Sequence, residues 1–457
     1  MNISGIIYLP LRPGLKELDS MQSWIPIEKI LKGEFTDKEV EIRGWIFRTR
    51  SSGKIAFPQI RDHTGIIQVT VIKGAVEDSE FEDAKKALVE SSVIVKGKVK
   101  SDERAPGGYE IQVKNFKVVG FAQAFPITKD QSEEFLRDNR HLWLRSRKIT
   151  SMMKIRSTVT GAIHEFFRGR GYYEFTPPIF QPMQSEGGST LFEVNYYDTK
   201  TYLSQSWQLY AEAAIFALEK VYDVSPTFRA EKSKTSRHLT EFWMAEMEAA
   251  WMELNECTEV AKDEIKFIIE TVLDKNKNEL EVLGRDLPKL EVCLEKPFPT
   301  ITYTEALDIL KEKSAIEIPW GKDLRTVEED ELMKHFDTPV VVTHYPKEIM
   351  AFYKPVDPDA DAPGPVAKCF DMLAPEGYGE LVGGSQRDTD IEQLKEYLEK
   401  DGESPSDYKF YFDTRRYGSV PHSGYGVGFE RLIAWICGVD NIKDAIPFPR
   451  TMTRVKP

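Results

Sequence analysis

The sequence contains few cysteines and no long apolar run. Its four cysteines lie far apart along the chain, and none belongs to a C-x-x-C pair. This spacing argues against a zinc ribbon or a disulfide scaffold and suits a reducing compartment. No apolar run is long enough to cross a bilayer, and the N-terminus lacks a basic segment followed by a hydrophobic block. These absences predict a cytoplasmic protein without a membrane partner.

An excess of positive charge is also missing. The chain has 61 lysines and arginines against 74 aspartates and glutamates, for a net charge of −13. Net charge is a poor guide to nucleic-acid binding, however, because screening limits the reach of exposed charges to about 10 Å. Between positions 41 and 73 there are only two acidic residues, whereas the basic residues are Arg43, Arg48, Arg50, Lys54, Arg61 and Lys73. A nucleic-acid partner is therefore not excluded.

The length and the texture of the sequence predict a small domain followed by a large one. A chain of 457 residues suits two or three domains. Short strand-like runs at 40–46, 66–72, 93–95 and 111–113, with a helix-like segment at 81–89, are typical of a small closed β-barrel. We expect an N-terminal extension at 1–24, the barrel at 25–122, a polar connector at 123–140 and an α+β domain at 141–457.

Helical periodicity marks the larger domain. Apolar residues recur at helical spacing between 152 and 167, at Met152, Ile155, Val159, Ile163 and Phe166. A second helix is expected at 258–273. Near the C-terminus, a strand leads into a glycine-rich turn and then into a helix at 429–437. Strands and helices therefore mix in this domain.

The segment 228–242 has the densest chemistry in the chain. It is too rich in charge for a core and too aromatic for a flexible tail. Apolar flanks on both sides predict two strands joined by a long polar loop. Such a hairpin can present cations to a polyphosphate, an aromatic face to a base and a carboxylate to an amino group. A solvated hairpin with surface ion pairs is the alternative, and the charge pattern alone favours neither.

A glycine-rich segment at 424–432 is the second signal. Gly424, Gly426 and Gly428 allow the backbone to approach a ligand closely, and Arg431 follows at the start of a helix, where it could face a phosphate. By itself the pattern is weak, and taken alone it favours a tight strand-to-helix turn. It is not a P-loop, because it lacks the Lys-Ser/Thr ending.

Together these segments resemble the signature motifs of class II aminoacyl-tRNA synthetases. Phe228 to Glu231 matches F-R-x-E, and 424–431 matches G-x-G-x-G-x-E-R. Thr176-Pro177-Pro178 resembles the first motif of the class, whose proline lies at a dimer interface. With the N-terminal barrel, the chain resembles the aspartyl/asparaginyl/lysyl subgroup. This resemblance implies an α+β multidomain protein, with an OB-fold barrel, a catalytic antiparallel sheet flanked by helices, and a homodimeric assembly.

The resemblance also implies an ATP site with two catalytic arginines. Arg229 would grip the α-phosphate and the amino-acid carboxylate, where negative charge grows in the transition state. His238 and Arg431 match the positions that hold the γ-phosphate, and Arg237 would assist them. No residue need act as a covalent nucleophile, because the substrate carboxylate itself attacks ATP.

Four further residues complete the implied nucleotide site. Phe242 would stack on adenine, with Arg431 on the other face, and Glu231 would face the adenine edge or the incoming tRNA end. Asp371 and Glu380 resemble the carboxylates that hold Mg²⁺ in this family, a hard cation that prefers oxygen ligands.

Three places in the sequence bear on the amino-acid substrate. By resemblance, Ser206 and Gln208 bind the substrate α-amino group, and Glu186 joins them from a loop. Trp207 departs from the small residue or proline common at its position. Ala211 stands where aspartate enzymes carry a lysine that pairs with the substrate carboxylate, so that charge is gone.

The other two places are Glu246 and Arg387. Glu246 stands where aspartate enzymes tend to carry Asp, and it can accept from an amide NH₂. Arg387 can donate to a carbonyl oxygen, so the two charges cancel around a neutral amide. A purely structural role is the alternative for Glu246 taken alone. The combination with Ala211 favours L-asparagine as the substrate and tRNA(Asn) as the acceptor.

Four barrel residues match the anticodon readers of the family: Arg48, Arg50, Phe57 and Gln68. Single-stranded RNA is read by stacking on aromatic rings and by hydrogen bonds to base edges. Phe57 would stack on the central anticodon uridine, while Gln68 and Arg50 contact its edge. Membership of the barrel core is the alternative for Phe57.

Three other functions stay open at this point. An aspartyl-tRNA synthetase, with strict or with relaxed tRNA choice, is disfavoured by Ala211. A paralogue that makes free asparagine without tRNA is disfavoured by the barrel with its RNA readers. A non-catalytic RNA-binding protein is disfavoured by Arg229, Glu380 and Arg431. His422 is more often a turn or packing residue than a proton carrier.

Overall fold

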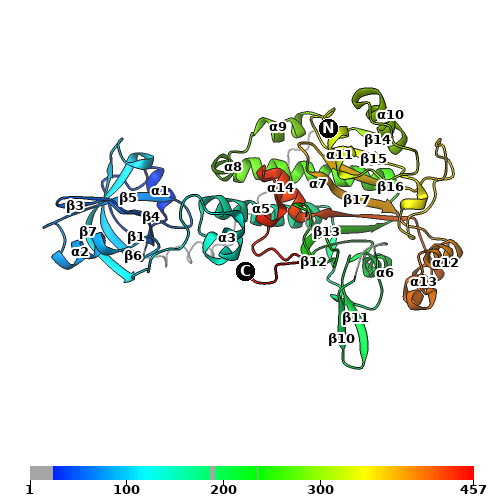
Figure 1. The fold of residues 1–457 in the computed structure, drawn as a ribbon, viewed down its shortest axis with the longest axis horizontal. Helices are drawn as coiled ribbons and strands as arrows, with labels where there is room; N and C mark the ends of the chain where they lie inside the picture. Colours follow the sequence, from blue (N-terminus) through cyan, green and yellow to red (C-terminus); the bar gives the residue numbers. More distant parts are fainter. Residues whose placement is uncertain (1–23, 186–190, 234) are drawn as a thin grey trace. The chain divides into compact units, whose positions relative to one another are not determined.

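The computed structural model describes residues 24–185, 191–233 and 235–457. The chain divides into two compact units, one ending at Gln131 and the other running from Ser132 to Pro457 (Figure 1). The predicted boundaries at 24, 122 and 140 stay predictions. Within the described ranges, no helix combines the length and the apolar character that a membrane span requires.

The first unit is a closed five-stranded barrel. Its strands follow the order β5-β4-β1-β6-β7, and parallel pairing of β5 with β7 closes the ring. Along β1, Val40, Ile42 and Ile46 are buried, and they alternate with Arg43 and Trp45, which face solvent. The strands are β1 (Glu39–Arg48), β4 (Gln59–Arg61), β5 (Ile66–Ile72), β6 (Ser92–Ser101) and β7 (Tyr109–Gly120), with the short β2 (Ser51–Ser52) and β3 (Ile55–Ala56) beside β5.

The helix of the barrel is displaced from its predicted position. Helix α2 spans Asp78–Lys86 rather than 81–89, because Ala87 has extended backbone angles. Phe81 and Ala84 are buried against the barrel, whereas Leu88 is 48% exposed. The apolar run after Lys86 therefore made the helical pattern look longer than the helix is. A short helix, α1 (Ile27–Leu31), packs against β5.

The second unit is built on an eight-stranded sheet of order β14-β15-β16-β17-β18-β13-β12-β8. The six strands from β15 to β12 pair antiparallel, as predicted, and a parallel strand is added at each edge. The strands are β8 (Tyr173–Glu174), β12 (Lys220–Phe228), β13 (Glu241–Ala250), β14 (Thr300–Thr302), β15 (Val340–Thr343), β16 (Cys369–Ala374), β17 (Gly379–Gln386) and β18 (His422–Gly428). A separate small sheet contains β9 (Phe180–Gln181), β10 (Glu193–Tyr196) and β11 (Thr199–Leu203).

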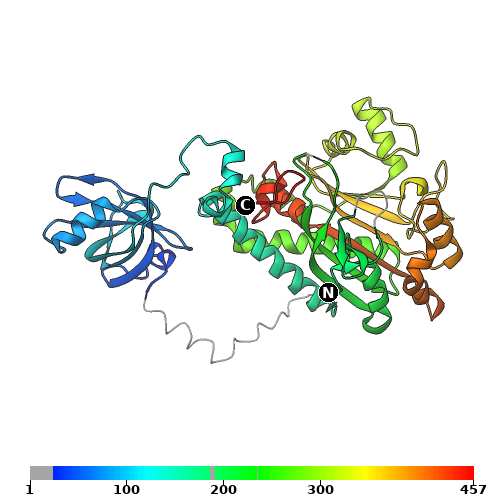
Figure 2. The ribbon, with the colours of Figure 1, turned by 60° about the horizontal axis from the view of Figure 1, so that its bottom comes forward.

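Two long helices cover this sheet, and both confirm their sequence patterns. Helix α5 (Arg147–Gly169) begins where the Ser146 hydroxyl accepts from the Ile149 amide, and it buries all five predicted apolar residues. Helix α7 (Leu254–Lys275) begins with a capping box between Glu253 and Glu256. Helix α7 packs against β17 and β18, and α5 lies beside α7 (Figure 2).

The remaining helices lie around these layers. Helix α14 (Phe429–Cys437) has the predicted bounds and ends at Gly438, whose left-handed backbone suits glycine. The others are α3 (Glu133–Asp138), α4 (Arg140–Trp143), α6 (Gln208–Leu218), α8 (Lys277–Leu283), α9 (Pro288–Glu295), α10 (Tyr303–Ser314), α11 (Thr326–Met333), α12 (Ile391–Lys400), α13 (Lys409–Arg416) and α15 (Ile442–Ala445).

A buried arginine ties the start of this unit to its C-terminal segment. Arg140 is fully buried, and its guanidinium donates to the backbone carbonyls of Asp444, Ile446 and Pro447 at 2.7–2.8 Å. The same C-terminal segment donates from the Ile442 amide to the Ser236 carbonyl, within the polar loop between β12 and β13. Arg140 therefore holds the segment that supports this loop.

Candidate active site

The polar segment at 228–242 forms the predicted hairpin. Strands β12 and β13 pair antiparallel up to Phe228 and Glu241, and the residues between them form the loop. The Arg229 guanidinium lies 5.4 Å from the centre of the Phe242 ring. Its Nε atom is buried and has no hydrogen-bond partner among the described residues. Arg229 thus has donor capacity left for an acceptor that enters from outside the protein.

One cavity brings together seven of the eight residues expected at the nucleotide site, and Asp371 is not among its lining residues. Its walls come from the hairpin, from β17 and from the β18–α14 turn. The predicted residues that line it are Arg229, Glu231, Arg237, His238, Phe242, Glu380 and Arg431. The structure therefore gathers in one place residues that lie up to two hundred positions apart in the sequence.

The turn from β18 into α14 aims Arg431 at this cavity. Arg431 Nη1 donates to the backbone carbonyl of Glu380 at 2.8 Å and lies 3.5 Å from its carboxylate. The preceding Glu430 is buried, accepts from the Trp243 amide at 2.9 Å and pairs with Arg156 at 2.7 Å. Glu430 therefore locks the helix to β13 and α5, and this leaves Arg431 on the open side.

Two basic residues of the loop differ in their surroundings. Arg237 pairs with Asp330 of α11 at 2.8 Å and also donates to the Gly377 carbonyl. His238 Nε2 lies 3.4 Å from Glu231. Burial, together with neighbouring Arg431 and Arg229, lowers the pKa of His238 although Glu231 opposes the shift. Both residues line the cavity and each has a carboxylate neighbour, Asp330 for Arg237 and Glu231 for His238.

Carboxylates converge beside the same cavity. A Cβ atom on Gly383 would lie 2.8 Å from Glu380 Oε1 and 3.6 Å from Asp371 Oδ1, so both acids approach one glycine. Burial and the charge of Glu380 raise the pKa of Asp371 well above its usual value. The same two causes raise the pKa of Glu329, on α11, to about 7. Mutual repulsion of this kind is relieved when a cation binds.

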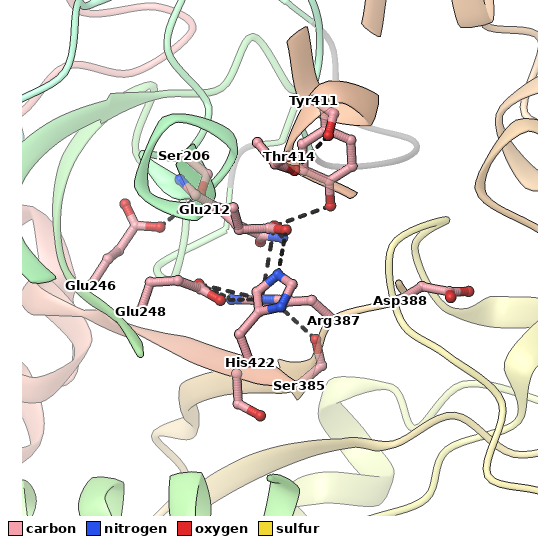
Figure 3. Close-up of polar contacts among 12 residues, drawn as sticks. Ser206, Glu212, Glu246, Glu248, Ser385, Arg387, Asp388, Tyr411, Thr414 and His422 are labelled. Carbon is pink, nitrogen blue, oxygen red and sulfur yellow. Dashed lines mark hydrogen bonds and ion pairs between the residues drawn. The ribbon is translucent and has the colours of Figure 1, made fainter. Parts of the chain in front are cut away.

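The start of α6 forms a second polar site (Figure 3). The Ser206 hydroxyl donates to Glu246 Oε1 at 2.7 Å, and the Trp207 amide donates to Glu246 Oε2 at 3.1 Å. Gln208 donates from its amide nitrogen Nε2 to Glu212 at 2.8 Å. The start of α6 therefore brings together three of the residues expected to bind the amino acid. Ser206 bonds to Glu246, and the Gln208 amide donates to the Ser206 hydroxyl.

Arg387 belongs to a buried ion-pair network (Figure 3). It donates to both oxygens of Glu248 at 2.8–3.3 Å and to the Ser385 hydroxyl at 2.8 Å. Its Nε also lies 4.0 Å from Glu212, which in turn pairs with Arg415 and His422. The direct partner of Arg387 is therefore Glu248, a carboxylate that the charge count from sequence did not include.

Trp207, at the start of α6, and Ala211, within that helix, belong to one apolar cluster. Trp207 is 2% exposed, and its indole nitrogen donates to the Phe175 carbonyl at 2.6 Å. Ala211, one turn later, is fully buried in the same cluster, which also contains Ile215 and Val221. Trp207 therefore anchors the N-terminus of α6, which explains its departure from the family pattern. Glu186 lies outside the described residues.

Three of the four predicted anticodon readers meet on the outer face of the barrel. The Arg50 guanidinium lies 5.0 Å from the centre of the Phe57 ring and donates to Gln68 Oε1 at 3.3 Å. Phe57 is half-buried and lies outside the barrel core cluster. Arg48 instead faces the ring of Phe47. This face offers an aromatic plane with donors beside it, as a single-stranded base requires.

Sequence reasoning missed Glu212, Glu248 and Arg415. Glu248 follows Glu246 by two positions on β13, and alternate strand residues share a face. Glu212 follows Gln208 by one helical turn. Both signals were present in the sequence. Arg415 approaches only through the tertiary fold, so no local pattern could have identified it.

Comparison with known proteins agrees with this geometry. Residues 132–452 match the family of class II tRNA synthetases (D, K and N), and residues 40–119 match an OB-fold nucleic acid binding domain. Asparagine–tRNA ligase of Thermoplasma acidophilum is 46% identical over 95% of this chain and 100% of that protein. The enzyme of the same name from Pyrococcus furiosus is 47% identical over 94% of this chain and 100% of its own length.

A solved structure is similar over nearly the whole chain. Asparaginyl-tRNA synthetase from Pyrococcus horikoshii, complexed with asparaginyl-adenylate, superimposes with a TM-score of 0.91 at 46% identity. The match covers 96% of this chain and 100% of that one. With the sheet, the motifs and the barrel in agreement, the chain belongs to the class II tRNA synthetases of the D, K and N group.

Proposed function

We propose that this protein is an asparagine–tRNA ligase. A carboxylate oxygen of L-asparagine attacks the α-phosphorus of ATP, diphosphate leaves, and asparaginyl-adenylate forms. The terminal ribose hydroxyl of tRNA(Asn) then attacks the acyl carbon and releases AMP. One observation carries the proposal: the seven residues expected to bind ATP line one cavity, and β13, which borders it, also supplies Glu246. Relatives named for this activity share 46–47% identity with the chain.

Arg229 is the residue proposed to stabilise the adenylation step. Its buried Nε lacks a partner among the described residues, and its guanidinium lies over Phe242. Non-bridging oxygens on the α-phosphorus gain negative charge as the new bond forms. A fixed bidentate cation therefore helps the transition state more than the ground state.

The other cavity residues are proposed to hold the ends of the nucleotide. Phe242 stacks on adenine with Arg431 on the opposite face, and Glu231 accepts from the adenine edge or meets the tRNA end. His238 and Arg431 hold the γ-phosphate. Arg237 assists them while it stays paired with Asp330, because one guanidinium can share its donors between two anions.

Asp371 and Glu380 are proposed to hold Mg²⁺. Both carboxylates approach Gly383, and burial beside Glu380 raises the pKa of Asp371, so a hard divalent cation fits this set. Mg²⁺ bound there would neutralise phosphate charge. The protein's own task is to hold the two carboxylates close together beside Gly383, where they face the phosphates.

The amide pocket is proposed to lie between Glu246 and Arg387. Glu246 accepts from the side-chain NH₂ of asparagine, and Arg387 donates to its carbonyl oxygen. Ser206 and Gln208, with Glu186, bind the α-amino group. Ala211 contributes no charge, because its side chain is a methyl group, and it packs among apolar residues. Aspartate would place a carboxylate against Glu246, at the cost of a hydrogen bond and with added repulsion.

The barrel is proposed to read the anticodon of tRNA(Asn). Phe57 stacks on the central base, Arg50 and Gln68 contact its edge, and exposed Arg48 meets phosphate. Glu110 supports this arrangement, because it accepts from both Gln68 and Thr70. Reading by stacking and edge contacts suits the splayed bases of a loop.

A cytoplasmic homodimer is proposed as the working form. Pro177 lies in the segment that resembles the dimer motif, and its neighbours Tyr173, Ile179 and Phe180 are 43–59% exposed. Exposed apolar side chains in such a segment suit an association surface. Sedimentation should give the mass of two chains, and a fully active monomer at every concentration would contradict the proposal.

The four cysteines are unpaired and buried, which suits a reducing compartment.

ATP–diphosphate exchange tests the function directly. Exchange should depend on asparagine, and aspartate should support it more poorly by about 10⁴-fold, the discrimination that a site built around one polar group can reach. Equal exchange with the two amino acids would make the protein an aspartate-activating enzyme instead. Charging of tRNA(Asn) transcripts should follow the same preference.

A further inference from the structure

Glu212 has no part in the function proposed above, yet it contacts Gln208 and lies near Arg387, two residues of the proposed amino-acid pocket (Figure 3). Its side chain is fully buried on α6. Oε1 accepts from Gln208 at 2.8 Å and from the Tyr411 hydroxyl at 3.1 Å. Oε2 accepts from Arg415 and from His422 Nε2. Each oxygen of the Glu212 carboxylate therefore has two hydrogen-bond partners.

These contacts join three separate parts of the chain. Gln208 lies on α6 with Glu212, His422 opens β18, and Arg415 and Tyr411 belong to α13. His422 Nδ1 lies 2.8 Å from the Val420 carbonyl, so both ring nitrogens face acceptors. Burial alone would raise the pKa of Glu212, but Arg415 and His422 hold that pKa below its usual value.

Arg387 also lies within ion-pair distance of the Glu212 carboxylate. Its guanidinium forms a bidentate ion pair with Glu248, and its Nε lies 4.0 Å from Glu212 Oε1. Two buried carboxylates thus share one guanidinium before any substrate arrives. Arg387 keeps N–H groups for a carbonyl oxygen but has little net positive charge left for a second anion. At low local dielectric, an unmatched substrate charge is strongly disfavoured.

We propose that Glu212 is a positioning and specificity-determining residue: it fixes Gln208 and Arg387 and withholds the positive charge that aspartate would need. This inference rests on the proposed function. It assigns the rejection of aspartate partly to a residue that need not touch the substrate. Ala211 and Glu212 then act together, because the first offers no cation and the second neutralises those nearby.

A metal site is the competing explanation for this cluster. Glu212, Glu248 and His422 could place one ligand atom each within 4.8 Å of one another. Arg387 and Arg415, however, already donate into the two carboxylates. These two guanidinium groups would repel a divalent cation. An ion-pair network explains the contacts without a metal.

Two variants that break the same ion pair with opposite changes in charge test the proposal. Glu212→Gln removes a negative charge, so the ratio of kcat/KM for asparagine to kcat/KM for aspartate in exchange should fall by about tenfold or more. Arg415→Gln removes a positive charge, so the same ratio should stay constant or rise. A merely structural role predicts that both variants move the ratio in the same direction, and that outcome would overturn the proposal.

Two further variants guard against loss of folding. The double variant Glu212→Gln/Arg415→Gln restores charge balance and should return the ratio toward the wild-type value; a ratio as low as that of Glu212→Gln alone would overturn the proposal. Glu264→Gln makes the same change at a buried glutamate on α7 that contacts Tyr425, away from this network, and should leave the ratio unchanged. Wild-type protein that fails to use asparagine would instead refute the proposed function.

Discussion

Glu264 allows a prediction about stability that can be worked out from the structure. This glutamate of α7 is fully buried, and its Oε2 accepts from the Tyr425 hydroxyl at 2.6 Å. Its Oε1 is buried with no partner among the described residues. Burial raises the pKa of Glu264 to about 8, although Tyr425 opposes the shift. In the unfolded chain its pKa is about 4.3.

The sign of the pH effect follows from these two values. Between about pH 4.3 and pH 8 the folded protein keeps a proton on Glu264 that the unfolded chain releases. This contribution to the free energy of unfolding is therefore complete at pH 4 and is lost as the pH rises toward 8. Each unit between the two pKa values corresponds to about 1.4 kcal/mol. The loss between pH 5 and pH 7.5 is then about 3 kcal/mol.

Glu264→Gln should remove this dependence. Glutamine keeps an oxygen to accept from Tyr425 and carries no titrating proton. The unfolding free energy of the variant, measured relative to wild type by urea titration with circular dichroism, should rise by about 3 kcal/mol from pH 5 to pH 7.5. Other carboxylates titrate equally in both proteins, so the difference isolates Glu264. A difference that is constant with pH would refute the reasoning.

Three other substitutions have expected outcomes. Arg229→Ala should lower ATP–diphosphate exchange by about 10²–10³-fold without changing the circular dichroism spectrum, because it removes a fixed donor at the reacting phosphate. Phe57→Ala should weaken tRNA charging by about 1–3 kcal/mol while exchange stays unchanged, since loss of stacking acts only on RNA. Arg140→Met should destabilise the catalytic domain by about 3–5 kcal/mol in urea titrations, because it leaves three buried carbonyls without their charged donor.

Each of these predictions has a control or a contrary outcome. Normal exchange by folded Arg229→Ala would remove this residue from the reaction. An equal loss of charging and exchange in Phe57→Ala would favour a packing role for that ring. Arg140→Lys keeps the charge but not the forked geometry and should lie between wild type and Arg140→Met, whereas no loss in either variant would show that the C-terminal segment is held elsewhere.

Features that repeat locally were predictable from sequence. The five apolar residues of α5 recur every three or four positions, and α14 begins after the last glycine of its turn, so periodicity and punctuation defined both helices. The hairpin around Arg229 followed from apolar flanks on a charged loop. Helix α2 was less well defined, because apolar residues after Lys86 continue the pattern although the backbone has turned away.

The site divides in the same way between local and distant signals. Residues of the nucleotide cavity fall in contiguous motifs, and a resemblance between motifs found them. No such motif identified Glu248 as the partner of Arg387, because the two residues become neighbours only when β13 and β17 join the same sheet. Buried ion pairs depend on distance in space, which a single sequence does not encode at short range. Trp207 became understandable only when its indole was seen to reach Phe175.

The place of β18 in the sheet has a consequence for how the enzyme is made. This strand lies between β17 and β13, yet residues 251–421 separate it from β13 along the chain. While the ribosome is still synthesising that stretch, β13 has one open edge and must wait for its neighbour. Nascent chains should therefore bind chaperones until β18 emerges. The catalytic pocket should then close in a single late step, so intermediates of translation are inactive rather than partly active.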